Sequence, residues 1–350
     1  MRSQPRFQDT GRGSFFGDLA YERLLRRYSN HFLVLLERLI DWEAASKQLL
    51  RMYKGRGCVG RRPYRPVLVF KMLFLSYLYN VSERAVEELA DVHLLAQWFL
   101  GLAVDAAPPD HSRLTAFKAR LLEGDNSQIL QGLFDSVILT AEGHGLQIGE
   151  LQLLDSVHTQ ADVNNAKERE RQEGGRPPRD PDAGVVHKGK RQVVQADGKA
   201  TVQEITFKGH KMHTAQSAVT GLVTSAHATR GSAADNKAFP TLREHDRELG
   251  LPVRAYGGDK AYDDTDIYER LEQEGLESAI TLRRQRTQKK DANQERWLEM
   301  EADPTYQARR GQRYRVEQPF GNVKRWHGFE RCRYLGLARY RSAMHGARRC

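Results

Sequence analysis

The chain has 350 residues, of which 39% are hydrophobic, so it can form one large domain or two smaller ones with buried cores. A net charge of +10 favours a polyanionic partner. Its cysteines, Cys58, Cys332 and Cys350, are too few and too widely spaced for a disulfide framework or a zinc site, which indicates a reducing cytoplasm. The N-terminus lacks a signal peptide's apolar core, and the most apolar run, 67–78, is too short to span a bilayer.

The first third of the chain has the apolar spacing of helices. Residues 1–20 are predicted to be a flexible lead, and residues 21–125 a compact, all-helical domain. Pro66 suits the first turn of a helix, where its missing N–H costs nothing. The helices are predicted at 32–39, 67–79, 83–90, 93–100 and 112–122. Such a domain suits DNA docking, but it suits many other functions as well.

From residue 146 the pattern changes to strands alternating with helices. Strands are predicted at 148–154, 202–207, 218–223, 252–256 and 278–282. Helices are predicted at 235–249, 264–274 and 309–326. The polar stretches 166–190 and 283–294 read as loops. This succession predicts an α/β domain with a mixed sheet over residues 146–345.

Three carboxylates stand where they could hold metal ions. Asp155 closes the first predicted strand, and Asp259 follows the fourth after two glycines that allow a phosphate to approach closely. Glu317 lies on the last predicted helix. Together they could hold two Mg²⁺ or Mn²⁺ ions about 4 Å apart, the arrangement used for displacement at phosphorus. Each acid also has a simpler interpretation, as a turn or cap residue for the aspartates and as an ion pair with Arg313 for Glu317.

The segment around Glu317 is strongly basic. Residues 301–350 hold 12 Lys and Arg against 4 Asp and Glu. At about 100° per residue, Arg313, Glu317 and Lys324 fall within about 40° of one another on a helix. One face could therefore offer a metal ligand to a phosphate and bind the DNA backbone on either side of it. The alternative is an ordinary solvated surface.

Short segments of the chain resemble motifs of one known family. In the helical domain these are 66–68, 99–102 and 109–112, and in the α/β domain 208–213, 235–239 and 258–262. Arg313, Glu317 and Lys324 match the family's arginine-x3-glutamate-x6-lysine signature. With this combination, the chain resembles a bacterial insertion-sequence transposase of the DDE type, in the insertion sequence 5 family, over about residues 30–340.

The resemblance implies an α/β, ribonuclease-H-like catalytic core behind an N-terminal, all-helical DNA-binding domain. It implies that Asp155, Asp259 and Glu317 bind two divalent ions, and that Arg313 and Lys324 contact DNA near the cleaved phosphate. Further DNA-binding candidates are Arg325, Lys208, Lys211 and Lys260. For the cluster at 208–213, a polar strand edge is an equal alternative. Zinc binding by His210 and His213 would need ligands that the sequence does not supply.

The predicted function is therefore transposition. The protein would bind terminal inverted repeats in the cytoplasm, at the nucleoid, cleave the element's ends and join each 3′-hydroxyl to target DNA, as a homodimer in the synaptic complex. A metal-dependent endonuclease without strand transfer is one alternative, and an inactive DNA-binding relic is another. Two departures matter: Arg310 replaces the signature tyrosine, which weakens the motif but removes no metal ligand, and the chain stops at Cys350, where related proteins usually continue. The second departure keeps the relic open.

Overall fold

The computed structural model describes residues 7–11, 13–53, 62–194, 200–289 and 293–347 and divides the chain into two compact units. Unit 1 comprises residues 1–141 and 345–350, and unit 2 comprises residues 142–344. Residues 1–6 of the expected lead, Cys58 and Cys350 lie outside the described residues, whereas Cys332 is a buried free thiol. Within the described part, no helix has the length and apolar character needed to cross a membrane.

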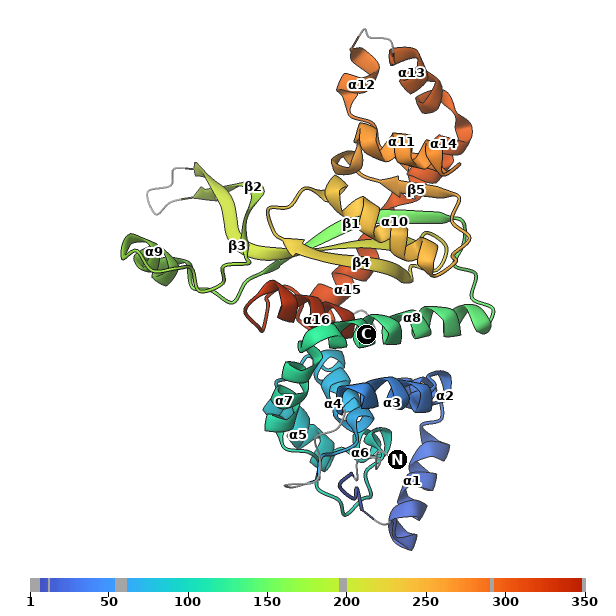
Figure 1. Ribbon diagram of the computed structural model, residues 1–350, viewed down its shortest axis with the longest axis vertical. Helices are drawn as coiled ribbons and strands as arrows, with labels where there is room; N and C mark the ends of the chain where they lie inside the picture. Colours follow the sequence, from blue (N-terminus) through green and yellow to red (C-terminus); the bar gives the residue numbers. More distant parts are fainter. Residues whose placement is uncertain (1–6, 12, 54–61, 195–199, 290–292, 348–350) are drawn as a thin grey trace. The chain divides into compact units, whose positions relative to one another are not determined.

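Unit 1 is all-helical, as predicted (Figure 1). Helix α1 begins at Phe15, inside the stretch expected to be a flexible lead, and α8 was not predicted. The elements are α1 (Phe15–Arg27), α2 (Phe32–Leu39), α3 (Trp42–Leu50), η1 (Arg51–Tyr53), α4 (Pro66–Leu78), α5 (Glu83–Val92), α6 (Leu94–Leu100), α7 (His111–Leu121), η2 (Gly124–Asn126) and α8 (Ser127–Gly143).

Helix α4 is the core of unit 1, since it is apolar and buried almost all the way round. It also carries a buried lysine, Lys71, whose Nζ lies 2.7 Å from Glu37 Oε2 and donates to the Phe99 carbonyl at 3.0 Å. The same ammonium sits 4.4 Å from the Trp42 ring centroid and 4.8 Å from that of Phe99. These contacts replace the water that the buried charge has lost.

Unit 2 is built on a six-stranded mixed sheet. The strands are β1 (Leu151–Gln160), β2 (Gly184–Val194), β3 (Ala200–Ser217), β4 (Val223–Arg230), β5 (Ala255–Gly258) and β6 (Glu277–Ile280). Strand β3 pairs antiparallel with β1, β2 and β4, while β5 pairs parallel with both β1 and β6. Apart from the added β2, the order is β4-β3-β1-β5-β6. Three antiparallel strands followed by two parallel ones form the ribonuclease-H-like core that the resemblance implies.

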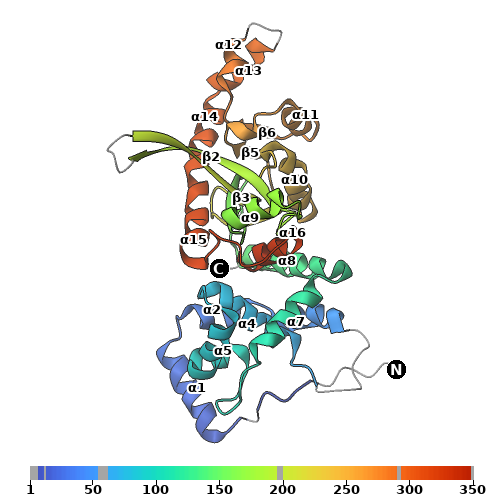
Figure 2. The same ribbon diagram turned by 90° about the vertical axis from the view of Figure 1, so that its left-hand side faces the viewer.

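Helices cover both faces of this sheet, with α10 on one side and α15 on the other (Figure 2). The Tyr256 hydroxyl of β5 donates to Asp246 of α10 at 2.8 Å, and Tyr340 of α16 stacks on His210 of β3. The helical elements of unit 2 are α9 (Asn165–Glu173), η3 (Asp235–Ala238), α10 (Phe239–Glu248), η4 (Lys260–Tyr262), α11 (Thr265–Gln273), α12 (Arg284–Gln288), α13 (Gln294–Ala302), α14 (Pro304–Arg310), η5 (Gly311–Val316), α15 (Glu317–His327) and α16 (Leu337–Ala347).

Several predicted elements of unit 2 were wrong. The strand expected at 218–223 is the turn between β3 and β4, because the Ser217 hydroxyl accepts from the Val219 and Thr220 amides and Gly221 has φ +72°. The loop expected at 166–190 contains α9 and most of β2, since Asn164 caps α9 and its buried Glu168 binds Lys208 at 3.0 Å. The last helix, expected at 309–326, is divided into α14, η5 and α15.

One buried carboxyl gives unit 2 a predictable response to pH. Asp246 has no exposed surface, and burial raises its pKa to about 6, against the opposing hydrogen bond from Tyr256. Ionisation is thus easier in the unfolded chain, and this carboxyl should reduce the free energy of unfolding by about 3 kcal/mol as pH rises from about 4 to about 6.

The measurement is urea unfolding of the native chain and of Asp246→Asn between pH 4.5 and pH 7.5. Asparagine keeps the side chain's shape but cannot ionise, so the variant should gain stability relative to the native chain as pH rises. A stability difference that stays constant across this range would show that Asp246 does not titrate as expected.

Candidate functional site

The pairing of two parallel strands ends close to Asp155 and Asp259. Leu153 of β1 pairs with Gly257 of β5, two residues before Asp155 and Asp259 on their segments, and the two aspartates lie close enough for the charge of Asp259 to raise the pKa of Asp155. Asp155 lies in the middle of β1 and not at its end, because β1 continues to pair with β3 as far as Gln160. Asp259 follows β5 directly, and its carboxylate accepts from the Ala261 amide at 2.9 Å to begin η4.

The two glycines before Asp259 lie where a larger side chain would be tightly packed. A Cβ on Gly257 would lie 3.1 Å from a Leu153 methyl carbon, and a Cβ on Gly258 would lie 3.0 Å from the Tyr262 ring. These neighbours pack directly against the glycine backbone. Both glycines therefore shape the turn that carries Asp259.

Asp155 is in an unusual electrostatic environment. Burial, together with the charges of Asp259 and Asp235, raises its pKa to about 6, against the opposing effects of the Ser156 amide and Arg313. A half-buried carboxylate beside a second one is a state that a bound cation would stabilise. Hard oxygen ligands on a rigid strand are what Mg²⁺ and Mn²⁺ prefer, so the residues present fit a divalent ion.

Glu317 and its basic neighbours come from the segment that passes β1. Arg313 lies in η5, close enough to Asp155 for its charge to lower that group's pKa. Glu317 begins α15, and its exposed side chain has no ion pair or hydrogen bond with the described residues. Lys324 and Arg325 follow two turns later on α15, the first half-buried and the second exposed.

The side chains of the three predicted ligand residues do not converge on one position for a single ion. No set of ligand atoms from Asp155, Asp259 and Glu317, all of which are described, lies within 4.8 Å of one another. In a two-ion site, the residues that share the ions need not all reach the same one.

The three predicted lysines of the sheet and its turn differ in their surroundings. Lys208 is held by Glu168, and Lys211 is buried, donating to the Ala233 carbonyl at 2.8 Å and to Asp235 at 3.4 Å. Lys260, next to Asp259, is exposed. The ammonium groups of Lys208 and Lys211 thus have partners inside the protein, whereas that of Lys260 faces solvent.

Two residues that we did not single out lie near the aspartates. Asp235 begins η3 and is held by His213, Ser156 and Lys211, which lower its pKa to about 2 in spite of burial. The Tyr262 hydroxyl is buried without a hydrogen-bond partner among the described residues, and Asp235, Asp155 and Asp259 all lie close enough for their charges to raise its pKa. Their positions within segments 235–239 and 258–262 were the only signal in the sequence.

A separate group of possible metal ligands occurs in unit 1. Glu87, Asp110 and His111 form a compact set among the described residues. Asp110 caps α7 through the Ser112 amide at 2.7 Å, and Glu87 accepts from the backbone and the ring of His111. These contacts account for the cluster as the fastening of the α7 N-terminus to α5.

Two protein-family models match the N-terminal and the C-terminal part of the chain separately. The family model described as Transposase domain (DUF772) matches residues 22–120, and the model described as Transposase DDE domain matches residues 132–350. Similar solved structures include a piggyBac transposase synaptic complex with hairpin DNA, with 12% identity, TM-score 0.33, and coverage of 72% of this chain and 51% of that one. The Mos1 mariner paired end complex with Mn has 12% identity, TM-score 0.21, and coverages of 75% and 72%.

The chain spans about half the length of the piggyBac chain that it matches. Sequence similarity is the decisive comparison, because the DDE-domain match alone covers more than half of the chain and includes Asp155, Asp259 and Glu317. The chain therefore belongs to the Transposase DDE domain family.

Proposed function

We propose that the chain is a DNA transposase of the insertion sequence 5 family that cleaves the ends of its element and joins their 3′-hydroxyls to target DNA. Asp155, Asp259 and Glu317 hold two Mg²⁺ or Mn²⁺ ions in this proposal. The observation that carries it is the half-buried Asp155, whose pKa is raised to about 6 by burial and by the nearby charges of Asp259 and Asp235.

The chain's own groups bind and orient the DNA. In this proposal, Arg313, whose charge lowers the pKa of Asp155, contacts the phosphate that is cut, and Lys324, Arg325 and Lys260 contact its neighbours. The internal partners of Lys208 and Lys211 favour a positioning role for these two lysines. Two divalent ions held by the three acids would supply activation of the attacking oxygen and stabilisation of the leaving one.

Binding of the inverted repeats and pairing of the two element ends are assigned to other parts of the protein in this proposal. Residues 21–125 bind the terminal inverted repeats, and two copies of the chain hold two element ends together. The protein acts at the nucleoid, in the cytoplasm. Since phosphate contacts supply most of the affinity, binding should weaken steeply as salt increases.

Strand transfer tests this function. Labelled, pre-cleaved duplexes are made from the DNA that flanks the chain's own reading frame, and they are mixed with protein, supercoiled plasmid and Mg²⁺ or Mn²⁺. Joined products that need the metal support the transposase. Metal-dependent nicking without joining favours the endonuclease, whereas binding without either reaction favours the inactive relic.

A further inference from the structure

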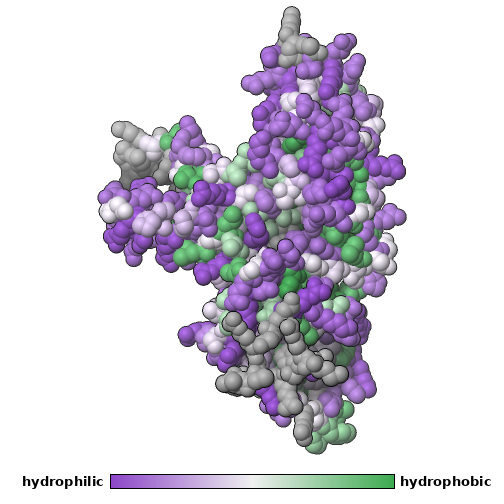
Figure 3. Space-filling model, viewed as in Figure 1, coloured by the Kyte–Doolittle hydropathy of each residue, from purple (hydrophilic) through white to green (hydrophobic). Residues whose placement is uncertain are grey.

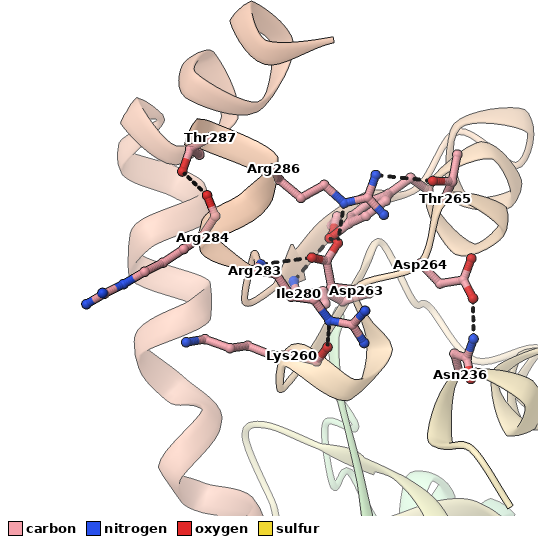
Figure 4. Close-up of polar contacts among 12 residues, drawn as sticks. Asn236, Lys260, Asp263, Asp264, Thr265, Ile280, Arg283, Arg284, Arg286 and Thr287 are labelled. Atoms are coloured by element: carbon pink, nitrogen blue, oxygen red, sulfur yellow. Dashed lines mark hydrogen bonds and ion pairs between the residues drawn. The ribbon is translucent and has the colours of Figure 1, made fainter. Parts of the chain in front are cut away.

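The turn that carries Asp259 is fastened to α12 by one buried carboxylate. Asp263 has no exposed side-chain surface and accepts three hydrogen bonds (Figure 4). The donors are the Tyr268 hydroxyl at 3.0 Å, the Arg283 amide at 2.8 Å and Arg286 Nε at 2.9 Å. Arg283 Nε in turn donates to the Lys260 carbonyl at 3.0 Å. The backbone on both sides of this contact is therefore held in place.

The four cations of this region differ in whether the protein itself binds them. Arg286 is used internally, since it binds Asp263 and Thr265 and lies over the Trp297 ring at 4.9 Å. Arg283 is exposed but tied to the Lys260 carbonyl. Lys260 and Arg284 are also exposed, and their side chains have no acidic partner among the described residues. In Figure 4 both extend to the same side, away from Asp263.

We propose that Lys260 and Arg284 form a phosphate-binding edge for the DNA strand, one nucleotide or more beyond the phosphate at the acids, and that Asp263 sets its position. This inference rests on the proposed function. Lys260 directly follows Asp259, with Cα atoms about 3.8 Å apart, so a strand with a phosphate at Asp259 passes Lys260. The planar guanidinium of Arg284 can bind the next phosphate with two hydrogen bonds.

The alternative is a pair of ordinary solvated cations, and the backbone argues against it. The carbonyl of Arg284 accepts from the Thr287 hydroxyl at 3.2 Å, and the preceding residue is bound to Asp263. Figure 3 shows hydrophilic residues over the α12–α13 region, which suits a polar partner. Two unpaired cations on a fixed backbone, beside the proposed catalytic turn, are complementary to a polyanionic strand.

The test compares Arg284→Ala with Arg296→Ala, an exposed arginine of α13 that is already paired with Glu272 at 3.2 Å. Binding of pre-cleaved ends is measured in Ca²⁺ at several salt concentrations. We expect Arg284→Ala to weaken binding about 10-fold and to reduce the salt slope by about 1, with no change for Arg296→Ala. Equal affinities and slopes for both variants would overturn the proposal.

Neutral methylphosphonates, placed singly along the strand, then locate the contact. At one position, the methylphosphonate should weaken binding by the native chain but not binding by Arg284→Ala. If the loss of affinity at every position is the same for both proteins, the proposal is also overturned. Asp263→Asn keeps Arg284 but loosens the backbone that supports it. The methylphosphonate at that position should therefore weaken binding by this variant less than it weakens binding by the native chain. If the native chain joins strands normally while Arg284→Ala matches it throughout, this inference fails and the proposed function stands. If the native chain neither binds nor joins the ends, the proposed function fails first.

Discussion

Asp155→Asn should abolish strand joining and yet stabilise the metal-free protein. Loss of one ligand for the ions should slow joining at least about 10³-fold, equivalent to roughly 4 kcal/mol. In the absence of metal, the half-buried Asp155 carboxylate is also repelled by Asp259 and Asp235, and its pKa of about 6 lies above its ordinary value. Its ionisation therefore costs stability above about pH 6, and asparagine should raise the free energy of unfolding at pH 7.5 by roughly 1–3 kcal/mol.

The gain should disappear below about pH 4, where Asp155 is protonated in both the folded and the unfolded chain. Urea unfolding with and without Mn²⁺ measures it, and the metal should stabilise the native chain more than Asp155→Asn. Glu317→Gln is the matched control, because Glu317 is exposed. It should lose joining without gaining metal-free stability. Native joining rates in Asp155→Asn would remove Asp155 from the site.

Lys71→Ala should destabilise unit 1 by about 2–4 kcal/mol. The substitution leaves Glu37, whose side chain is only 30% exposed, without the ammonium 2.7 Å away, and it removes the cation from the Trp42 and Phe99 rings. Burial lowers the pKa of Lys71, and the Glu37 carboxylate opposes that shift. Urea or thermal unfolding, followed by the fluorescence of the tryptophans, measures the loss.

A double variant separates the ion pair from the packing around it. Lys71→Met with Glu37→Gln removes both charges and fills the space under Trp42 and Phe99, so it should lie within about 1 kcal/mol of the native chain. Lys71→Met alone should resemble Lys71→Ala, because Glu37 stays unpaired. If both single variants are as stable as the native chain, the pair has no structural role.

Secondary structure was predicted best where local pattern and burial agree. Residues 32–39 form α2 as expected, and α4, α5, α6 and α7 lie within one or two residues of their predicted bounds. Apolar spacing and caps such as Ser82 decide these helices within a few residues of chain. The errors lie where contacts between residues far apart in the chain decide the secondary structure. For example, β3 has 18 residues and not the six expected at 202–207, because its two halves pair with different strands.

The candidate site also has features that the sequence predicts and features that only the fold reveals. The sequence supplies the acids and the cations, but it cannot show that Lys211 is buried against Asp235, that Tyr262 lies near three aspartates, or that Asp263 joins the Asp259 turn to α12. These are matters of strand register and burial, which depend on residues far apart in the chain.

By itself, the sequence determined the all-helical first unit and the mixed α/β class of the second, because composition and periodicity are local properties. Its short motifs also carried the resemblance to a DDE transposase. The tertiary structure alone decided that Asp155 lies near Asp259 and which cations have a partner inside the protein. The sequence determines the charge of a side chain, but the fold sets its partners, because a buried cation needs a partner inside the protein whereas an exposed one can be solvated.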